Sequence, residues 1–155
     1  MSDIKYQNDH YNFAYRVSAL IYNKEKTKIL IFRGNDMNFY MLPGGKVREF
    51  EKSENAIKRE ICEELGYENL KFEFIGVSEE FVTKRENKIH EITMTYKCIY
   101  DGEIQEESFK SKESDWINFK WININELYNY DIHPNSISVM MNGRNHIVEE
   151  INFLT

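Results

Sequence analysis

The sequence has few of the residues that build disulfide scaffolds, collagen-like repeats or long linkers. Its 155 residues include two cysteines, two prolines and seven glycines, and no apolar run approaches a membrane-spanning length of roughly 20 residues. The first residues lack the apolar segment of a signal peptide. Cys62 and Cys98 have no metal-ligand spacing, so we expect two reduced, buried thiols. These absences predict a cytoplasmic protein that does not bind membranes.

Acidic residues outnumber basic residues in the sequence. Lys and Arg total 20 against 26 Asp and Glu, which gives a formal net charge of -6. That balance argues against binding to extended nucleic acid or to an anionic membrane, because both require a basic face. Hydrophobic residues at 41% and aromatic residues at 14% exceed what a disordered chain carries. We therefore expect one folded domain over residues 1–155, long enough to bury its own core.

Short runs rich in β-branched and aromatic residues predict an α+β fold in which strands dominate. The strands are expected at residues 13–22, 28–33, 39–42, 71–82, 90–100 and 119–122. Residues 1–12 read as a loose lead-in, 43–45 as a loop, and 101–114 as a polar surface loop. Short helices are expected at 123–128 and from Pro134, whereas 146–153 fits either a strand or a helix.

The strongest helix signal covers residues 53–65. Ile57, Ile61 and Leu65 recur every four residues and form an apolar stripe. Ser53 is the expected N-cap, and Gly66 stands where a C-terminal capping glycine belongs.

This helix also carries Glu60, Glu63 and Glu64 on one face, a spacing at which like charges repel. Such a face is either simply solvated or a site for Mg²⁺ or Mn²⁺, which prefer oxygen ligands. The glycine pair Gly44–Gly45 ahead of the helix favours the second interpretation, because glycine lets the backbone approach a ligand closely. The two interpretations stay open on the pattern alone.

The spacing of the charged and glycine residues matches a known signature. The fixed positions run from Gly45 to Gly66, and the whole resembles the Nudix box of the Nudix (MutT-like) hydrolase family. Its conserved residue types are present at Gly45, Glu51, Arg59, Glu60, Glu63, Glu64 and Gly66, and only the last, usually aliphatic position departs, as Tyr67. Similar segments outside the box extend the resemblance to about residues 11–145 and lie at residues 39–45, 80–81, 90–92, 119–122 and 125–127.

The resemblance implies the Nudix fold, a mixed β-sheet flanked by helices in an α/β/α sandwich. It also implies a metal-dependent hydrolase that cleaves the diphosphate bond of a nucleoside diphosphate linked to another moiety. The expected Mg²⁺ or Mn²⁺ ligands are Glu60, Glu63, Glu64 and the Gly44 carbonyl, with Glu60 or Glu64 also expected as general base. Arg59 and Glu51 are expected to pair and hold the loop against the helix; an ordinary surface ion pair is the alternative.

Further candidates lie outside the box. Glu91 is the first candidate for a further acidic metal ligand, with a solvent-facing strand residue as the alternative, and Glu80 is the second candidate. Candidates for phosphate contacts are Arg33, Lys46 and Arg16. The alternative is that each is an ordinary surface residue, since lysines and arginines are common on protein surfaces.

The substrate class stays open between a nucleoside triphosphate, a nucleotide sugar and another small diphosphate. Family markers for ADP-ribose, diadenosine polyphosphates, NADH and coenzyme A are absent. A catalytically silent nucleotide-binding Nudix domain is the main alternative, and an isomerase or decapping-type relative is a lesser one. A homodimer is a further expectation from the family. The acid excess is then the reason for a metal requirement, because bound cations reverse the local charge.

Overall fold

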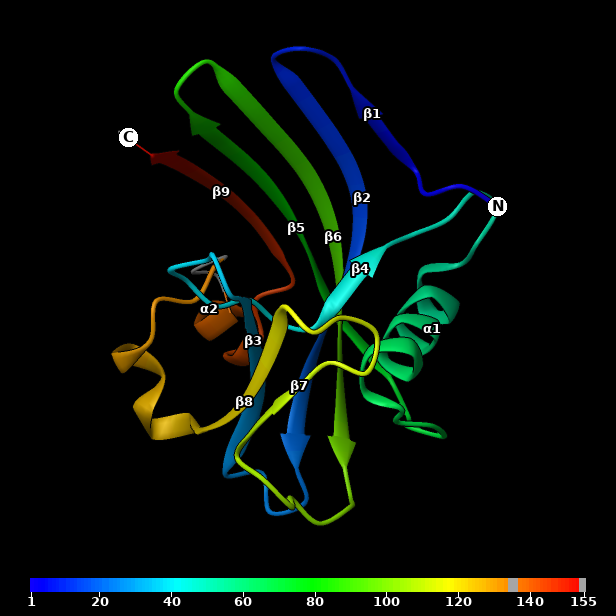
Figure 1. Ribbon diagram of the computed structural model, residues 1–155, viewed down its shortest axis with the longest axis vertical. Helices are drawn as coiled ribbons and strands as arrows, with labels where there is room; N and C mark the ends of the chain where they lie inside the picture. The colour runs from blue at the N-terminus through cyan, green and yellow to red at the C-terminus, as the bar shows by residue number, and fades with distance from the viewer. Residues whose placement is uncertain (134–136, 154–155) are drawn as a thin grey trace.

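A mixed β-sheet makes up most of the molecule (Figure 1). The computed structural model describes residues 1–133 and 137–153. Over these residues the sheet has nine strands in the order β7-β8-β3-β2-β6-β5-β9, with β1 and β4 also paired to β2. The strands are β1 (Lys5–Gln7), β2 (Tyr11–Asn23), β3 (Lys28–Gly34), β4 (Gly44–Lys46), β5 (Glu73–Lys84), β6 (Asn87–Tyr100), β7 (Ser108–Lys110), β8 (Ile117–Asn123) and β9 (His146–Phe153).

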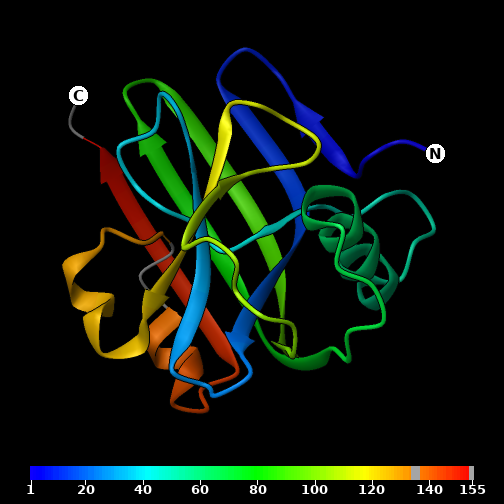
Figure 2. The ribbon, with the colours of Figure 1, turned by 60° about the horizontal axis from the view of Figure 1, so that its bottom comes forward.

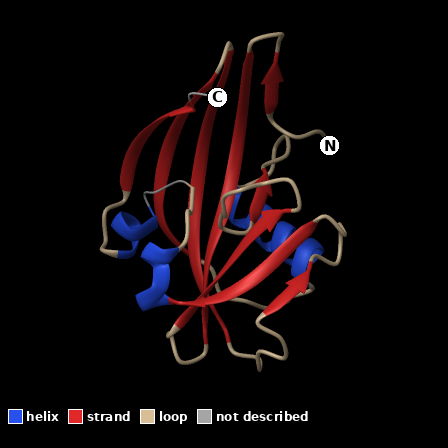
Figure 3. Ribbon diagram, turned by 60° about the vertical axis from the view of Figure 1, so that its left-hand side comes forward, coloured by secondary structure: helices blue, strands red, loops and turns tan. Residues whose placement is uncertain are grey.

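The described helices are few and short, as Figure 3 shows. They are α1 (Ser53–Leu65), the 3₁₀ helix η1 (Ile124–Asn129) and α2 (Ile137–Met141). Within the described part of the chain, none has the length and apolar composition needed to cross a bilayer. α1 and α2 lie on opposite sides of the sheet (Figures 1 and 2).

The two sides of β2 build two separate cores. Side chains alternate between the faces of a strand, so Val17 and Ala19 pack with α1 while Leu20 packs with α2. β2 runs parallel to β6 along its whole length, from Tyr11 opposite Lys88 onward. This layered arrangement agrees with the α+β prediction and places α1 against the middle of the sheet.

Helix α1 has the bounds that the sequence predicts. Ile57, Ile61 and Leu65 are buried, so the apolar stripe faces the sheet. Gly66 adopts a left-handed conformation with φ of 72°, and its N–H donates to the Cys62 carbonyl oxygen at 2.9 Å. Glycine suits this position because it tolerates positive φ without a Cβ clash.

The prediction for Ser53 as N-cap is wrong. Lys52 occupies the N-cap position and makes no side-chain capping hydrogen bond. The Ser53 hydroxyl instead lies 2.6 Å from the Tyr96 hydroxyl on β6. A tertiary contact therefore replaces the local cap and ties the start of α1 to the sheet.

Four segments differ from the sequence prediction. The expected lead-in contains β1, and the expected loop at 101–114 contains β7; both strands span three residues and gave no periodic signal. Residues 39–42 form only isolated bridges, Met41 with Phe32 and Tyr40 with Ile132. The glycine loop at 43–45 overlaps β4, where a Cβ on Gly44 would collide with the Val17 carbonyl oxygen. Because glycine has no Cβ, this segment can pair closely with β2, although its proline and glycines predicted a loop.

The remaining differences concern ends and exposure. Residues 146–153 form a strand, β9, parallel to β5. η1 is a 3₁₀ helix, and α2 spans Ile137–Met141. The predicted helix start at Pro134 lies outside the described residues. Cys98 is buried as expected, but Cys62 is exposed because it lies on the outer face of α1.

Candidate active site

Arg59 on α1 joins the segments that precede and form the box helix. Its Nε and Nη2 atoms donate to the two carboxylate oxygens of Glu51 at 2.9 and 3.0 Å. Nη2 also donates to the Lys46 carbonyl oxygen at 3.0 Å. The hydrogen bond from Arg59 holds the pKa of Glu51 below its usual value. Two charge-assisted bonds in fork geometry fix this loop more firmly than a single ion pair would.

The same guanidinium orients two of the box glutamates. Nη1 of Arg59 donates to Glu60 Oε1 at 2.9 Å and to Glu63 Oε2 at 3.4 Å. Glu60 lies directly against Gly45, where a Cβ would collide with its carboxylate. A glycine at position 45 therefore makes room for a carboxylate close to the β4 backbone.

Carboxylates crowd the face of α1 that turns toward this loop. Burial raises the pKa of Glu64 to about 8, and the charges of Glu60 and Glu113 add to the effect. Burial also raises the pKa of Glu60, against the lowering effect of Arg59. Half-buried oxygen donors with unbalanced negative charge are the donor set that a hard divalent cation fits. In the described residues, however, no three acidic, histidine or cysteine side chains converge closely enough to hold a metal as they stand.

Glu113 is a residue that the sequence analysis missed. The loop that carries it docks on the end of α1, where the Lys112 N–H and the Ser111 hydroxyl donate to the Glu64 carbonyl oxygen at 2.9 and 3.3 Å. The charge of Glu113 contributes to the raised pKa of both Glu60 and Glu64. Glu113 lies in an acidic polar stretch with no periodicity, so only the tertiary structure singles it out.

A cavity of about 370 Å³ lies on the α2 side of the sheet, and none of the box residues lines it. Its floor consists of polar side chains from β2, β5 and β6, and its apolar walls come from residues 39–42, from α2 and from β9. Arg16 on the floor pairs with Glu91 at 3.5 Å, and both side chains are about one-fifth exposed at 19% and 22%. Positive charge on Arg16 lowers the pKa of both Glu64 and Glu80, so Arg16 lies within electrostatic reach of the box helix and of the cavity floor.

Glu80 lies deeper in the floor and is 7% exposed. Its two oxygens accept hydrogen bonds from the Ser78 hydroxyl at 2.7 Å and the Thr93 hydroxyl at 3.1 Å. Burial raises the pKa of Glu80 to about 7, with Glu91 as a lesser contributor.

The predicted phosphate-contacting residues do not all gather in one place. Arg16 lines the 370 Å³ cavity, together with Glu91 and Glu80. Lys46 lines a neighbouring cavity of about 240 Å³, which shares Glu91 with the first. Arg33 lines neither of them and lies over the Tyr40 ring at 5.1 Å.

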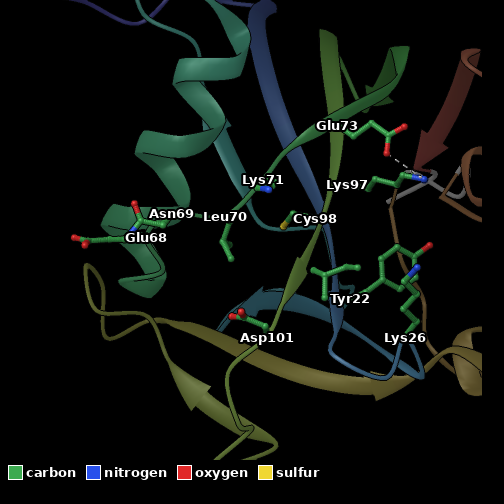
Figure 4. A pocket seen from close by; sticks show the side chains of 11 residues that line it. Tyr22, Lys26, Glu68, Asn69, Leu70, Lys71, Glu73, Lys97, Cys98 and Asp101 are labelled. Atoms are coloured by element: carbon green, nitrogen blue, oxygen red, sulfur yellow. Dashed lines mark ion pairs between the residues drawn. The ribbon is translucent and has the colours of Figure 1, made fainter.

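A larger cavity of about 710 Å³ lies elsewhere, between the chain that follows α1 and the ends of β2 and β6 (Figure 4). Both positively and negatively charged side chains surround it, and Glu73 pairs with Lys97 at 3.5 Å. Figure 4 shows the other charged side chains standing apart around the opening. This cavity is here called the distal cavity. Like the 370 Å³ cavity it contains none of the box residues, but it also lacks Arg16, whose charge acts on Glu64.

Comparison with known proteins identifies the family. The NUDIX domain family model matches residues 12–142. The 8-oxo-dGTP diphosphatase of Buchnera aphidicola subsp. Acyrthosiphon pisum (strain APS) is 36% identical over 66 residues, which are 42% of this chain and 53% of that protein. The match therefore spans about half the length of that curated relative.

Solved structures agree on the fold. The MutT protein of Bacillus halodurans matches over 90% of both chains, with a TM-score of 0.65 and 15% identity. The MutT NUDIX hydrolase of Burkholderia pseudomallei matches over 84% of this chain and 97% of its own, with a TM-score of 0.64 and 19% identity. At these identities the likeness concerns the fold, and it confirms the predicted Nudix architecture. The chain belongs to the NUDIX domain family.

Proposed function

We propose that the protein is a divalent-metal-dependent hydrolase that cleaves a diphosphate bond in a small nucleotide, with nucleoside triphosphates as the favoured substrates. The observation that carries the proposal is the Arg59 network. Three of its five hydrogen bonds go to the loop ahead of α1, at Glu51 and the Lys46 carbonyl oxygen, and two go to Glu60 and Glu63 on the glutamate face. The resemblance to a diphosphatase acting on 8-oxo-dGTP supports this substrate class.

The proposed ligands of Mg²⁺ or Mn²⁺ are the carboxylates of Glu60, Glu63 and Glu64 and the carbonyl oxygen of Gly44. Glu113 joins them as a candidate from outside the box, because its charge acts on Glu60 and Glu64. Glu91 stays a candidate ligand, although it is paired with Arg16 in this structure. A divalent ion bound there supplies Lewis-acid chemistry, withdrawing charge from the diphosphate and acidifying the attacking water.

Four residues of the chain have separate proposed roles in the reaction. Glu64 is the proposed general base, since it lies half-buried among the carboxylates of the box face, where burial raises its pKa in the metal-free protein and makes it a better proton acceptor than an exposed glutamate. Arg59 and Glu51 are positioning residues that keep Glu60 and the preceding loop in place. Arg16, between the box helix and the cavity, is placed to bind phosphate oxygens with its forked N–H donors.

The 370 Å³ cavity is the proposed nucleoside site. Its volume lies within the range of about 300–1,000 Å³ that small-molecule sites occupy. Phe39 and His133 on its wall lie edge to face with ring centroids 4.8 Å apart, and Phe153 stacks near Phe39 at 6.5 Å. Aromatic walls above a polar floor suit a planar base attached to a sugar.

We propose a cytoplasmic location, since the free thiols of Cys62 and Cys98 fit a reducing compartment.

The test is a panel of nucleoside triphosphates and nucleotide sugars, assayed with Mg²⁺, with Mn²⁺ and with EDTA. Turnover that requires the metal and falls in E64Q supports the proposal. Metal binding without turnover of any compound would instead favour a catalytically silent nucleotide-binding domain.

A further inference from the structure

We propose that Glu80 is a specificity-determining residue that accepts hydrogen bonds from the N1–H and the 2-amino group of a guanine ring. This inference rests on the proposed function, because it assigns a base preference to the cavity proposed for the nucleoside. It names a residue outside the box and outside the metal-binding face of α1.

The first step is the unused bonding capacity of Glu80. An ionised carboxylate offers about four lone-pair sites, and the hydroxyls of Ser78 and Thr93 occupy one on each oxygen. Both hydroxyls belong to strands of the cavity floor, so the carboxylate is held in a fixed orientation. Capacity for further donors remains on a side chain that lines the cavity.

The second step is the cost of this burial. A carboxylate that is 7% exposed loses most of its hydration, which two neutral hydroxyl donors replace only in part. Two cations line the same cavity: Arg16 is engaged with Glu91 at 3.5 Å, and Lys84 is exposed to solvent at the end of β5. Two additional N–H donors from a ligand would supply what the protein leaves incomplete.

The third step is the shape around Glu80. Leu42, Val82 and Met140 are among the apolar residues that line the same cavity. Apolar walls hold a flat ring and keep water away from its edge. A base that offers no donor to Glu80 leaves the buried carboxylate with the Ser78 and Thr93 hydroxyls as its donors, so the hydration displaced by the base is not replaced, which is costly.

The bases differ in what they offer to a carboxylate. Guanine places N1–H beside the 2-amino group, so two donors point the same way. Hypoxanthine retains N1–H but lacks the 2-amino group, and adenine presents an unprotonated N1 whose lone pair faces the carboxylate. Oxidation at C8 does not alter this edge, so Glu80 should treat guanine and 8-oxoguanine alike.

The experiment compares kcat/KM for GTP, ITP and ATP with Mg²⁺ in the wild type, in E80Q and in the control E79Q. Glu79 belongs to the same strand but faces the opposite side, where it pairs with His146 at 2.9 Å. We expect the wild type to prefer GTP over ATP by at least about 30-fold, with ITP between them. E80Q should reduce that preference to below about 3-fold, mainly through KM for GTP, while E79Q keeps the wild-type ratio.

Equal rates on GTP and ATP in the wild type, or an E80Q loss that is the same for all three nucleotides, would overturn the inference. E80D, which keeps the charge and withdraws it from the ring, should also reduce the preference if E80Q proves too unstable to assay. If no triphosphate is turned over, the proposed function fails. Calorimetric binding of GMP and AMP to the wild type and to E80Q then decides the inference separately, with loss of a GMP preference as the supporting result.

Discussion

The molecule has a small cavity lined by Arg16, whose charge reaches Glu64 on the box helix, and a distal cavity about twice as large; their volumes are 370 and 710 Å³. Size alone favours the distal one. Around the small cavity, however, half-buried charges converge: Arg16 pairs with Glu91, and Glu80 is fixed by two hydroxyls. Around the distal cavity the side chains of Glu73 and Lys97 are exposed and their ion pair is solvated. The candidate site is distinguished by charged groups that are buried at a cost in desolvation free energy, whereas exposed ion pairs contribute little to stability or to function.

The largest expected effect separates the box helix from the distal cavity by activity. E64Q removes a proposed metal ligand and general base, so we expect kcat/KM to fall by about 10³-fold or more. The matched change E68Q alters an exposed glutamate of the distal cavity and should leave kcat/KM within about 2-fold. Steady-state kinetics with Mg²⁺ measures both, and a similar loss in the two variants would remove the distinction.

A second difference concerns the stability of the box loop. R59A leaves Glu51 and Glu60 without the guanidinium that bonds them, in a place where Arg59 and Glu51 are only 17% and 16% exposed. We expect the free energy of unfolding to fall by about 2–4 kcal/mol, measured by urea denaturation. K58A, which breaks an exposed pair with Glu54 on the same helix, should cost less than about 0.5 kcal/mol. Equal losses would show that the Arg59 network is an ordinary surface feature.

The pH dependence of the metal-free protein gives a third prediction. Unfolded Glu64 releases its proton near the ordinary pKa of 4.5, whereas the native state holds it up to about pH 8. Between these values the native state binds more protons, so the stabilising contribution present below pH 4.5 is lost as the pH rises through 8.

E64Q removes this dependence. In EDTA, the free energy of unfolding of E64Q minus that of the wild type should therefore be about 1–3 kcal/mol larger at pH 9 than at pH 5, as measured by urea denaturation. Added Mg²⁺ should narrow the gap at pH 9 by stabilising the ionised wild-type carboxylate. An unchanged difference between the two pH values would show that Glu64 is not held in its protonated form.

The smallest effect is expected in the distal cavity. K97A breaks the exposed ion pair with Glu73, and we expect less than about 0.5 kcal/mol of destabilisation and an unchanged KM. A several-fold rise in KM would mean that the distal cavity takes part in substrate binding.

Local patterns predicted the parts of the molecule that depend on local sequence. The apolar stripe at Ile57, Ile61 and Leu65 gave the bounds of α1, and the glutamate spacing singled out the face that Arg59 organises. The pairing of Arg59 with Glu51 is also confirmed.

Features that depend on distant contacts could not be predicted. β4 pairs with β2 through glycines that read as a loop, and Ser53 bonds Tyr96 instead of capping its own helix. Glu113 is brought to the end of α1 by a loop that bonds the Glu64 carbonyl. Neither a homodimer nor the ligand set of the metal follows from these contacts, and both stay predictions.

The central claim is that the carboxylates of α1, and not those of the distal cavity, bind the divalent cation. The most direct test is to titrate the wild type, E64Q and E68Q with Mn²⁺ and to monitor the free ion by its EPR signal. We predict that the wild type and E68Q deplete free Mn²⁺ alike, whereas E64Q binds at least about 10-fold more weakly. Unchanged Mn²⁺ binding in E64Q, or a loss in E68Q instead, would contradict the claim.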